Sequence, residues 1–259
     1  MSGTLQRNRV ALQTIALKEI RRFLRIWVQT ILPAAITMAL YLVIFGNLIG
    51  TRIGDMGGHR YIDYIVPGVI MMSVITNAYA NVVSSFFGAK LQKHVEEMLV
   101  SPTPNAIILI GFVAGGVARG LAVGLAVTAV SMCFTDLRVT HIAVTLSVVL
   151  LTATLFSLAG FINAIFAKTF DDVSIILTFV LTPLTYLGGV FYSIELLPRF
   201  WQQASLLNPI LYMVDAFRYG ILGHSDIDIA SAFAIILSFI TALFAAALTL
   251  LNRGVGIRT

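Results

Sequence analysis

The residues that could carry chemistry are few in this sequence, and they form no enzyme signature. It has no GxxxxGK[ST] loop for nucleotide phosphates, no HExxH zinc motif and no GxSxG nucleophile motif. The four histidines fall in loops or at loop edges: His59, His94, His141 and His224. An intramembrane serine protease is therefore excluded, because it needs a histidine beside a serine inside the bundle. With a single cysteine, Cys133, the sequence predicts no catalytic residue and no metal site.

The loop at residues 88–105, GAKLQKHVEEMLVSPTPN, carries charges at helical spacing. Glu96 and Glu97 follow Lys93 at i+3 and i+4, where ion pairs form on a helix. Ser101 and two prolines end this short helix, which we place at residues 90–100. Its other face is apolar: Val95, Met98 and Leu99. An apolar face outside the membrane is typical of a docking element, and a plain solvated loop is the alternative.

Arg119 lies within an apolar stretch, GGVARGLAVGLAV. Charges in a membrane span usually face the bundle interior or a water path, and the surrounding glycines allow close helix packing. Arg119 therefore either lines a translocation path or is a structural charge that pairs internally or reaches the inner interface. Asp171 and Asp172, in the loop KTFDD, are candidate partners or caps of the following helix.

Membrane helices must position these side chains, because 58% of the 259 residues are hydrophobic and only 11% are charged. A soluble domain carries about 25% charged residues. A spanning helix needs about 20 mostly apolar residues. Six stretches satisfy this: 27–49, 64–88, 108–134, 142–167, 173–193 and 229–251. The sequence therefore predicts an all-α membrane protein with one domain, residues 1–259.

The basic residues predict the orientation of the chain. With the N-terminus inside, 11 lysines and arginines fall in inner segments and 5 in outer segments, which favours two inner termini. Residues 1–26 form an amphipathic helix, which we expect at the membrane interface. Its basic residues recur at i, i+3, i+4 and i+7: Lys18, Arg21, Arg22 and Arg25. The net charge of +5 thus reflects basic residues that collect on the cytoplasmic loops of a membrane protein, and we expect membrane lipids, not nucleic acid, as partners.

Residues 194–223 are apolar but contain charges that are costly within a lipid-facing span, about 2.5–3.5 kcal/mol each. We expect two short helices that enter the outer leaflet and return. Pro198 and Pro209 then lie near helix starts, where the absent N–H costs nothing. Asp215 and Arg218, three residues apart, are expected to pair on one helix face.

Three stretches resemble the permease subunits of type-2 ABC transporters, a class that exports polysaccharides, lipids and drugs. HVEEMLVSPTP is similar to the coupling-helix segment of that family, with Glu96 and Ser101 at matching positions. PLTYLGGVFYSIELLPRFWQQASLLNP is similar to its outer segment. NPILYMVDAFRYGIL matches the family pattern at Asn208, Pro209 and Arg218.

The resemblance implies a multi-pass protein of the bacterial inner membrane. Two permease chains, expected as a homodimer, surround a path, and two copies of a separate ABC ATPase bind ATP and magnesium. The chain itself would then hold no cofactor and be no enzyme. Closure of the ATPases would act on residues 90–100. The alternative is a channel or secondary carrier that needs no ATPase. The sequence does not reveal the cargo.

Overall fold

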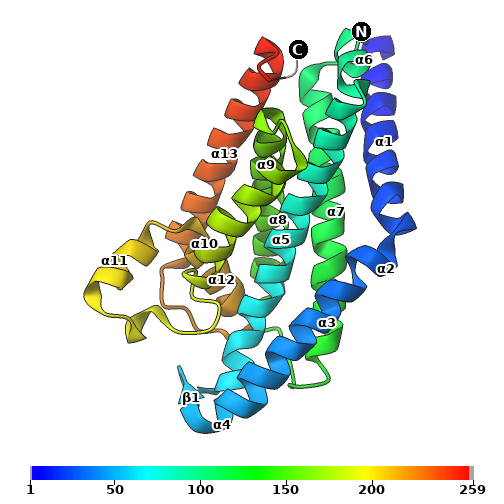
Figure 1. Cartoon of the computed structure of the whole chain (residues 1–259). Coiled ribbons are helices and arrows are strands. Elements are labelled where there is room, and N and C mark those ends of the chain that lie inside the picture. Colours follow the sequence, from blue (N-terminus) through cyan, green and yellow to red (C-terminus); the bar gives the residue numbers. More distant parts are fainter. Residues whose placement is uncertain (1, 257–259) are drawn as a thin grey trace.

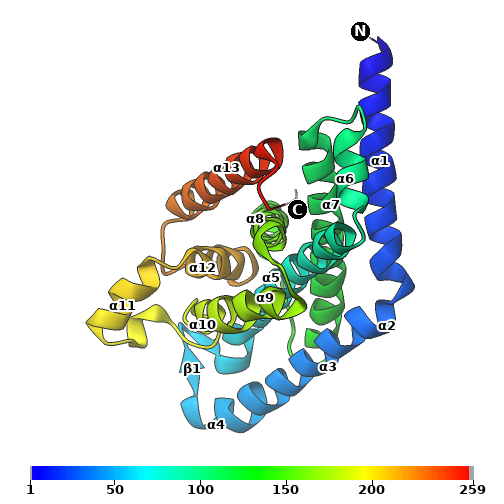
Figure 2. The same ribbon diagram turned by 45° about the horizontal axis from the view of Figure 1, so that its top comes forward.

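The structure is a computed structural model that describes residues 2–256, so Arg258 and the ends of the expected domain lie outside the described residues. It is an all-α membrane protein built around one long helix, α5 (Tyr61–Leu91), whose apolar window is 83% buried. Two other long helices pack on α5, α7 (Asn105–Ser131) and α8 (Ile142–Phe166), and α13 (Ile229–Arg253) packs on α8 (Figures 1 and 2). α5 thus contacts almost every element that carries a candidate site.

The N-terminal helix α1 (Ser2–Arg25) lies along α7, and the chain then enters the first membrane stretch (Figure 1). That stretch consists of consecutive helical pieces: α2 (Trp27–Thr30), α3 (Leu32–Tyr41), the π-helix η1 (Leu42–Ile49) and α4 (Gly50–Ile53). A short hairpin of β1 (Asp55–Met56) and β2 (His59–Arg60) leads into α5. Its two-residue turn is Gly57-Gly58, both at positive φ, as tight hairpins require.

Within residues 2–256, five helices are long and apolar enough to cross a membrane. They cover five of the expected spans, with bounds Trp27–Gly46, Tyr61–Leu91, Asn105–Ser131, Ile142–Phe166 and Ile229–Arg253. The span expected at 173–193 is shorter. It consists of α9 (Phe170–Ile175), the π-helix η2 (Ile176–Leu181) and α10 (Thr182–Tyr186). The helix ends at Tyr186 because Gly189, at φ 72°, turns the chain.

The hairpin expected at 194–223 contains a 3₁₀ turn, η3 (Ile194–Leu196), and two short helices, α11 (Arg199–Leu206) and α12 (Pro209–Leu222). Pro198 precedes α11 and Pro209 opens α12, as predicted. α12 packs between α5, α8 and α13, so it belongs to the core of the bundle. The side chain of Glu195 lies outside the described part.

The start of α1 and the end of α13 lie at the same end of the bundle, together with the short helix α6 (His94–Val100) (Figure 1). We call this the inner end, following the orientation predicted from the basic residues. The β-hairpin and the loop between α7 and α8 lie at the opposite, outer end (Figure 1). This arrangement agrees with an even number of crossings, and the count of six stays a prediction.

Candidate functional site

At the inner end, α6 follows α5 after a sharp change of direction at Lys93, which adopts the left-handed conformation at φ 61°. The predicted helix at residues 90–100 is therefore too long, because Lys90 and Leu91 still belong to α5. α6 has seven residues. Ser101 ends it, and its hydroxyl donates to the Met98 carbonyl at 2.6 Å. The turn at Lys93 directs α6 across the end of the bundle.

The apolar face of α6, which was expected to dock a partner, packs largely within the chain itself. Val95 is 1% exposed, and Met98 and Leu99 are half-buried against a cluster of core side chains. The reason is that α6 folds back onto the end of α5 and its neighbours. The surface of α6 is instead acidic, with Glu96 and Glu97 exposed. Val100, 87% exposed, is a large apolar side chain at its tip.

A cleft of about 550 Å³ lies beside α6. Lys90 fixes one wall, because its ammonium group donates to the carbonyls of Ile165 at 2.6 Å and Ala167 at 2.8 Å, at the end of α8. Lys93 and Lys168 are exposed at the same cleft. The lining is largely apolar, and its charged side chains are three lysines and one acidic residue, Glu96, so the cleft can receive an acidic or apolar protein segment.

Inside the bundle, three polar residues of α5 form a ladder on one helix face: Asn77, Asn81 and Ser85, each four residues apart. Each holds a charged side chain from another helix. Arg119 of α7 donates to the Asn77 side-chain oxygen at 3.1 Å. Arg22 of α1 donates to the Asn81 side-chain oxygen at 2.9 Å and to its carbonyl at 3.0 Å. The ladder therefore joins α1, α5 and α7.

Glu19 completes this polar ladder. It is fully buried, pairs with Arg22 at 3.2 Å and accepts a hydrogen bond from Ser85. A Cβ at Gly115 of α7 would lie 2.4 Å from Glu19, so only glycine lets α1 approach closely enough. The predicted basic face of α1 is therefore partly wrong, because Arg22 turns into the bundle. The spacing of Asn77, Asn81 and Ser85 in an apolar helix is the signal that could have located this cluster.

Arg119 is half-buried, and its described hydrogen-bond partner is Asn77 rather than either aspartate considered above. Asp172 instead forms a capping box with Thr169 at the start of α9, and Asp171 is exposed there. Hydrogen bonds from the backbone N–H groups of Lys168 and Thr169 lower the pKa of Asp172. Whether Arg119 lines a path stays a prediction.

The pair predicted in α12 is present and buried. Arg218 and Asp215 lie 3.6 Å apart, and each side chain is 2% exposed. Arg218 also donates to the Gly189 carbonyl at 2.7 Å and lies over the ring of Tyr64, 4.0 Å from its centroid. Asp215 accepts from the Ser225 hydroxyl at 2.5 Å and from the N–H groups of the next two residues in the loop before α13. The charges are fully engaged in holding α12 to its neighbours.

Asn208 and Pro209 determine where α12 begins. The Asn208 side-chain oxygen accepts from the N–H of Ile210 at 3.0 Å, and its amide donates to the Leu184 carbonyl at 2.6 Å. Pro209 occupies the first turn, where a missing N–H is tolerated. The Asn-Pro pair thus caps α12 and attaches it to α10, a structural role at the site that sequence similarity indicated.

Comparison with known proteins agrees with these features. Residues 10–222 match the model of the family described as ABC-2 type transporter. The chain is 59% identical over 250 residues to the inner membrane transport permease YadH of Escherichia coli (strain K12), covering 96% of this chain and 98% of that protein. It is 25% identical over 215 residues to nodulation protein J of Rhizobium leguminosarum bv. trifolii, covering 83% and 82%.

Proposed function

The chain belongs to the ABC-2 type transporter family, and from that premise we propose that it works as a homodimeric exporter driven at α6 by a separate ABC ATPase. The family membership itself establishes a membrane permease of an ABC transporter. The chain is a multi-pass protein of the inner membrane, as its relative is named and its apolar helices require. It is a transport component, like other permeases of the family.

The surface of α6 is the single observation that supports coupling most directly. A buried Val95 anchors the helix, so a force on α6 is transmitted to the core rather than absorbed by a loose loop. Val100 is exposed at the tip, and Glu96 and Glu97 are exposed beside it. Protein contacts concentrate their energy in a few apolar anchors with charges at the rim. α6 offers this arrangement to an ATPase.

The polar ladder gives α6 a route into the membrane. α5 precedes α6 directly, and its Ser85, Asn81 and Asn77 hold Glu19, Arg22 and Arg119 in turn. A displacement of α5 therefore changes hydrogen bonds with both α1 and α7. In this proposal Arg119 serves as a link between helices, which also leaves it available to cargo on its partly exposed side.

We place the second copy on the face formed by α3 and α10. The windows of the first span and of α13 are each only 17% buried within one chain, so both need lipid or protein cover, and polar groups favour the face of α3 and α10 for the partner. Tyr41 and Tyr186 meet on this face through their hydroxyl groups at 2.6 Å. Polar groups are costly in contact with lipid tails, and a partner chain covers them better. The path for cargo would then run between the two copies.

The remaining parts of the proposal rest on the family resemblance. Two ATPase subunits would bind ATP and magnesium, and the permease would contribute no nucleotide site. Cargo would move outward, as in the exporter class that the sequence resembles. Coupling and dimerisation can each be measured without a defined cargo.

The test compares co-purification and ATP hydrolysis in membranes that contain the chain and its ATPase. Val100→Asp should reduce ATPase binding at least several-fold, while the amount of permease in the membrane stays normal. Val139→Asp introduces the same charge at an exposed valine of the outer end and should change neither. If Val100→Asp retains normal ATPase binding and hydrolysis, α6 is not the coupling element.

The dimer is tested separately by disulfide crosslinking. Cys133 is exposed and is first replaced by serine. Ile36→Cys and Leu40→Cys, on the exposed face of α3, should crosslink two copies in native membranes. Leu237→Cys, on the exposed face of α13, is the matched control and should not. The reverse pattern would move the dimer interface to α13.

A further inference from the structure

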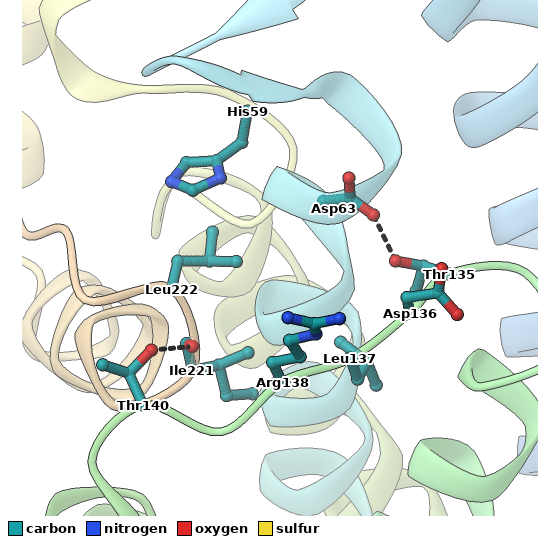
Figure 3. Close-up of a pocket in the computed structure, with 9 residues that line it drawn as sticks. All are labelled: His59, Asp63, Thr135, Asp136, Leu137, Arg138, Thr140, Ile221 and Leu222. Atoms are coloured by element: carbon teal, nitrogen blue, oxygen red, sulfur yellow. Dashed lines mark hydrogen bonds between the residues drawn. The ribbon is translucent and has the colours of Figure 1, made fainter.

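Two adjoining cavities lie at the outer end of the bundle. The first, which we call the outer pocket, measures about 270 Å³ and is lined by polar side chains, including His59, Asp63 and Arg138 (Figure 3). The second, the outer crevice, measures about 300 Å³ and is lined mostly by apolar side chains of α7, α8 and α12. Leu137 and Ile221 line both cavities. The two together form a site with a polar end and an apolar end.

The loop between α7 and α8, which lines both cavities, is held in place at both ends. Thr135 donates a hydrogen bond to the Asp63 carboxylate at the start of α5 (Figure 3). Thr140 donates to the Ile221 carbonyl from its hydroxyl at 2.8 Å, and the His141 N–H donates to the Gly220 carbonyl at 2.8 Å. The residues between these anchors are therefore positioned before any ligand arrives, which lowers the cost of binding.

The charges of the outer pocket are of both signs. Asp63 is engaged by Arg60 at 2.8 Å and 3.1 Å. Asp136 is exposed on the loop. The guanidinium group of Arg138 projects into the pocket (Figure 3), and within residues 2–256 it has no ion pair. Arg138 and Asp136, two residues apart in the loop, form no ion pair within the described residues, so the pocket offers one cation and one carboxylate to a ligand that carries groups of both signs.

We propose that the outer pocket and outer crevice together bind one zwitterionic phospholipid of the outer leaflet. Its phosphate contacts Arg138, because guanidinium groups bind phosphate oxygens strongly. Its ammonium group lies near Asp136, and one acyl chain occupies the outer crevice, where apolar surface leaves water and bulk lipid. A free phosphate would leave the crevice empty, and a plain hydrocarbon would leave the charges unused.

The exposure of the crevice walls fits entry from the membrane. Leu125 of α7 is 72% exposed and Leu146 of α8 is 62% exposed, so the crevice opens sideways to lipid. Each cavity alone lies near the lower limit of ligand sites, about 300–1,000 Å³, and together they lie within that range. The site is separate from the α3 and α10 face, so its lipid need not be the exported cargo.

The experiment uses the full-length chain in liposomes containing phosphatidylethanolamine with a photoreactive group in one acyl chain. Crosslinked residues are mapped by mass spectrometry. Arg138→Gln removes the phosphate contact, and Arg52→Gln is its control at another exposed arginine of the outer end. Thr128→Phe fills the crevice, and Ala129→Phe is its control at the exposed neighbouring residue of α7.

We expect crosslinks concentrated at the crevice in the unmodified chain, reduced several-fold by Arg138→Gln and by Thr128→Phe and unchanged by both controls. Unlabelled phosphatidylethanolamine should compete, whereas phosphatidylglycerol and free phosphoethanolamine should compete poorly. Equal labelling in all variants, or equal labelling of α3 and α13, would mean ordinary surrounding lipid and overturn the proposal. Equal competition by phosphatidylglycerol would overturn the zwitterionic preference, and competition by phosphoethanolamine would overturn the role of the acyl chain.

Discussion

α6 and α12 are both short helices that carry acidic residues and pack on α5, yet their charges have opposite surroundings. In α12, Asp215 and Arg218 are 2% exposed and bind several partners inside one chain. In α6, Glu96 and Glu97 are exposed, and only the apolar side is covered. The difference separates charges that build the fold from charges that are free to meet another protein.

The largest expected effect is in α12. Arg218→Leu leaves Asp215 buried without its cation, and breaking such a pair costs about 3–5 kcal/mol. The protein level in the membrane and the thermal stability in detergent should fall together. Arg199→Leu, at an exposed arginine of α11, is the control and should change both little. Equal stability of the two variants would mean that the charges of α12, like the exposed charges of α6, contribute little to the fold.

The next effect contrasts two valines of α6. Val95→Asp places a carboxylate in the core, where an unpaired polar group costs at least about 1–3 kcal/mol, so folding should suffer. Val100→Asp, five residues away, should leave stability nearly unchanged and act on ATPase binding instead. Detergent melting curves measured beside co-purification distinguish the two. If Val100→Asp also destabilises the protein, the two valines do not distinguish a buried side of α6 from an exposed side.

A smaller effect is expected in the polar ladder. Glu19→Gln removes the buried charge but keeps a hydrogen-bonding group, so we expect a loss of about 1–3 kcal/mol, the cost of leaving a buried hydrogen-bonding or charged partner unsatisfied. Asp55→Asn, at an exposed carboxylate of the outer β-hairpin, is its control. If the ladder transmits motion, Glu19→Gln should also reduce ATP hydrolysis in the assembled complex. An unchanged melting temperature would contradict the role of Glu19 in attaching α1.

The smallest effect concerns the helix caps. Hydrogen bonds from the backbone N–H groups of Lys168 and Thr169 lower the pKa of Asp172. Hydrogen bonds from the backbone N–H and the side-chain hydroxyl of Ser231 lower the pKa of Asp228. Because the pKa is lowered in the folded state, the caps stabilise the fold fully at pH values above the ordinary carboxylate pKa, about 3.9. This stabilisation is lost as the pH falls through the lowered pKa. Asp172→Asn should therefore flatten the acid side of the stability curve slightly. Melting curves between pH 7 and about pH 3 measure this. An unchanged slope would mean that the cap contributes nothing.

Much of this arrangement follows from composition and periodicity. Apolar length predicts the long helices, because lipid forces every backbone group into helical hydrogen bonds. The spacing of Asp215 and Arg218 predicts their pairing, and the prolines predict where the outer helices begin. These features depend on local rules, so sequence is sufficient for them.

The errors came from contacts between distant segments. Val95, Met98 and Leu99 were expected to meet a docking partner, because periodicity identifies an apolar face but not what covers it. Arg22 was assigned to a basic helix face turned toward lipid headgroups and water, because its partners Asn81 and Glu19 lie on two different helices. The span at 173–193 was predicted too long because the sequence stays apolar beyond the turn at Gly189, so hydropathy does not mark the end of the helix. Tertiary packing decides each of these cases.

The glycines of α7 have a consequence for motion. A Cβ at Gly111 would meet Ile15 of α1 at 2.5 Å, and one at Gly116 would meet Val82 of α5 at 2.4 Å. Helices with interlocking side chains resist axial sliding, because each ridge must leave its groove. The glycines remove ridges from α7, but Ile15 and Val82 fill the grooves that remain, so α1 and α5 can shift along α7 only by small shear displacements that keep these side chains within the grooves. We therefore expect α7 to remain the stationary reference while its neighbours move.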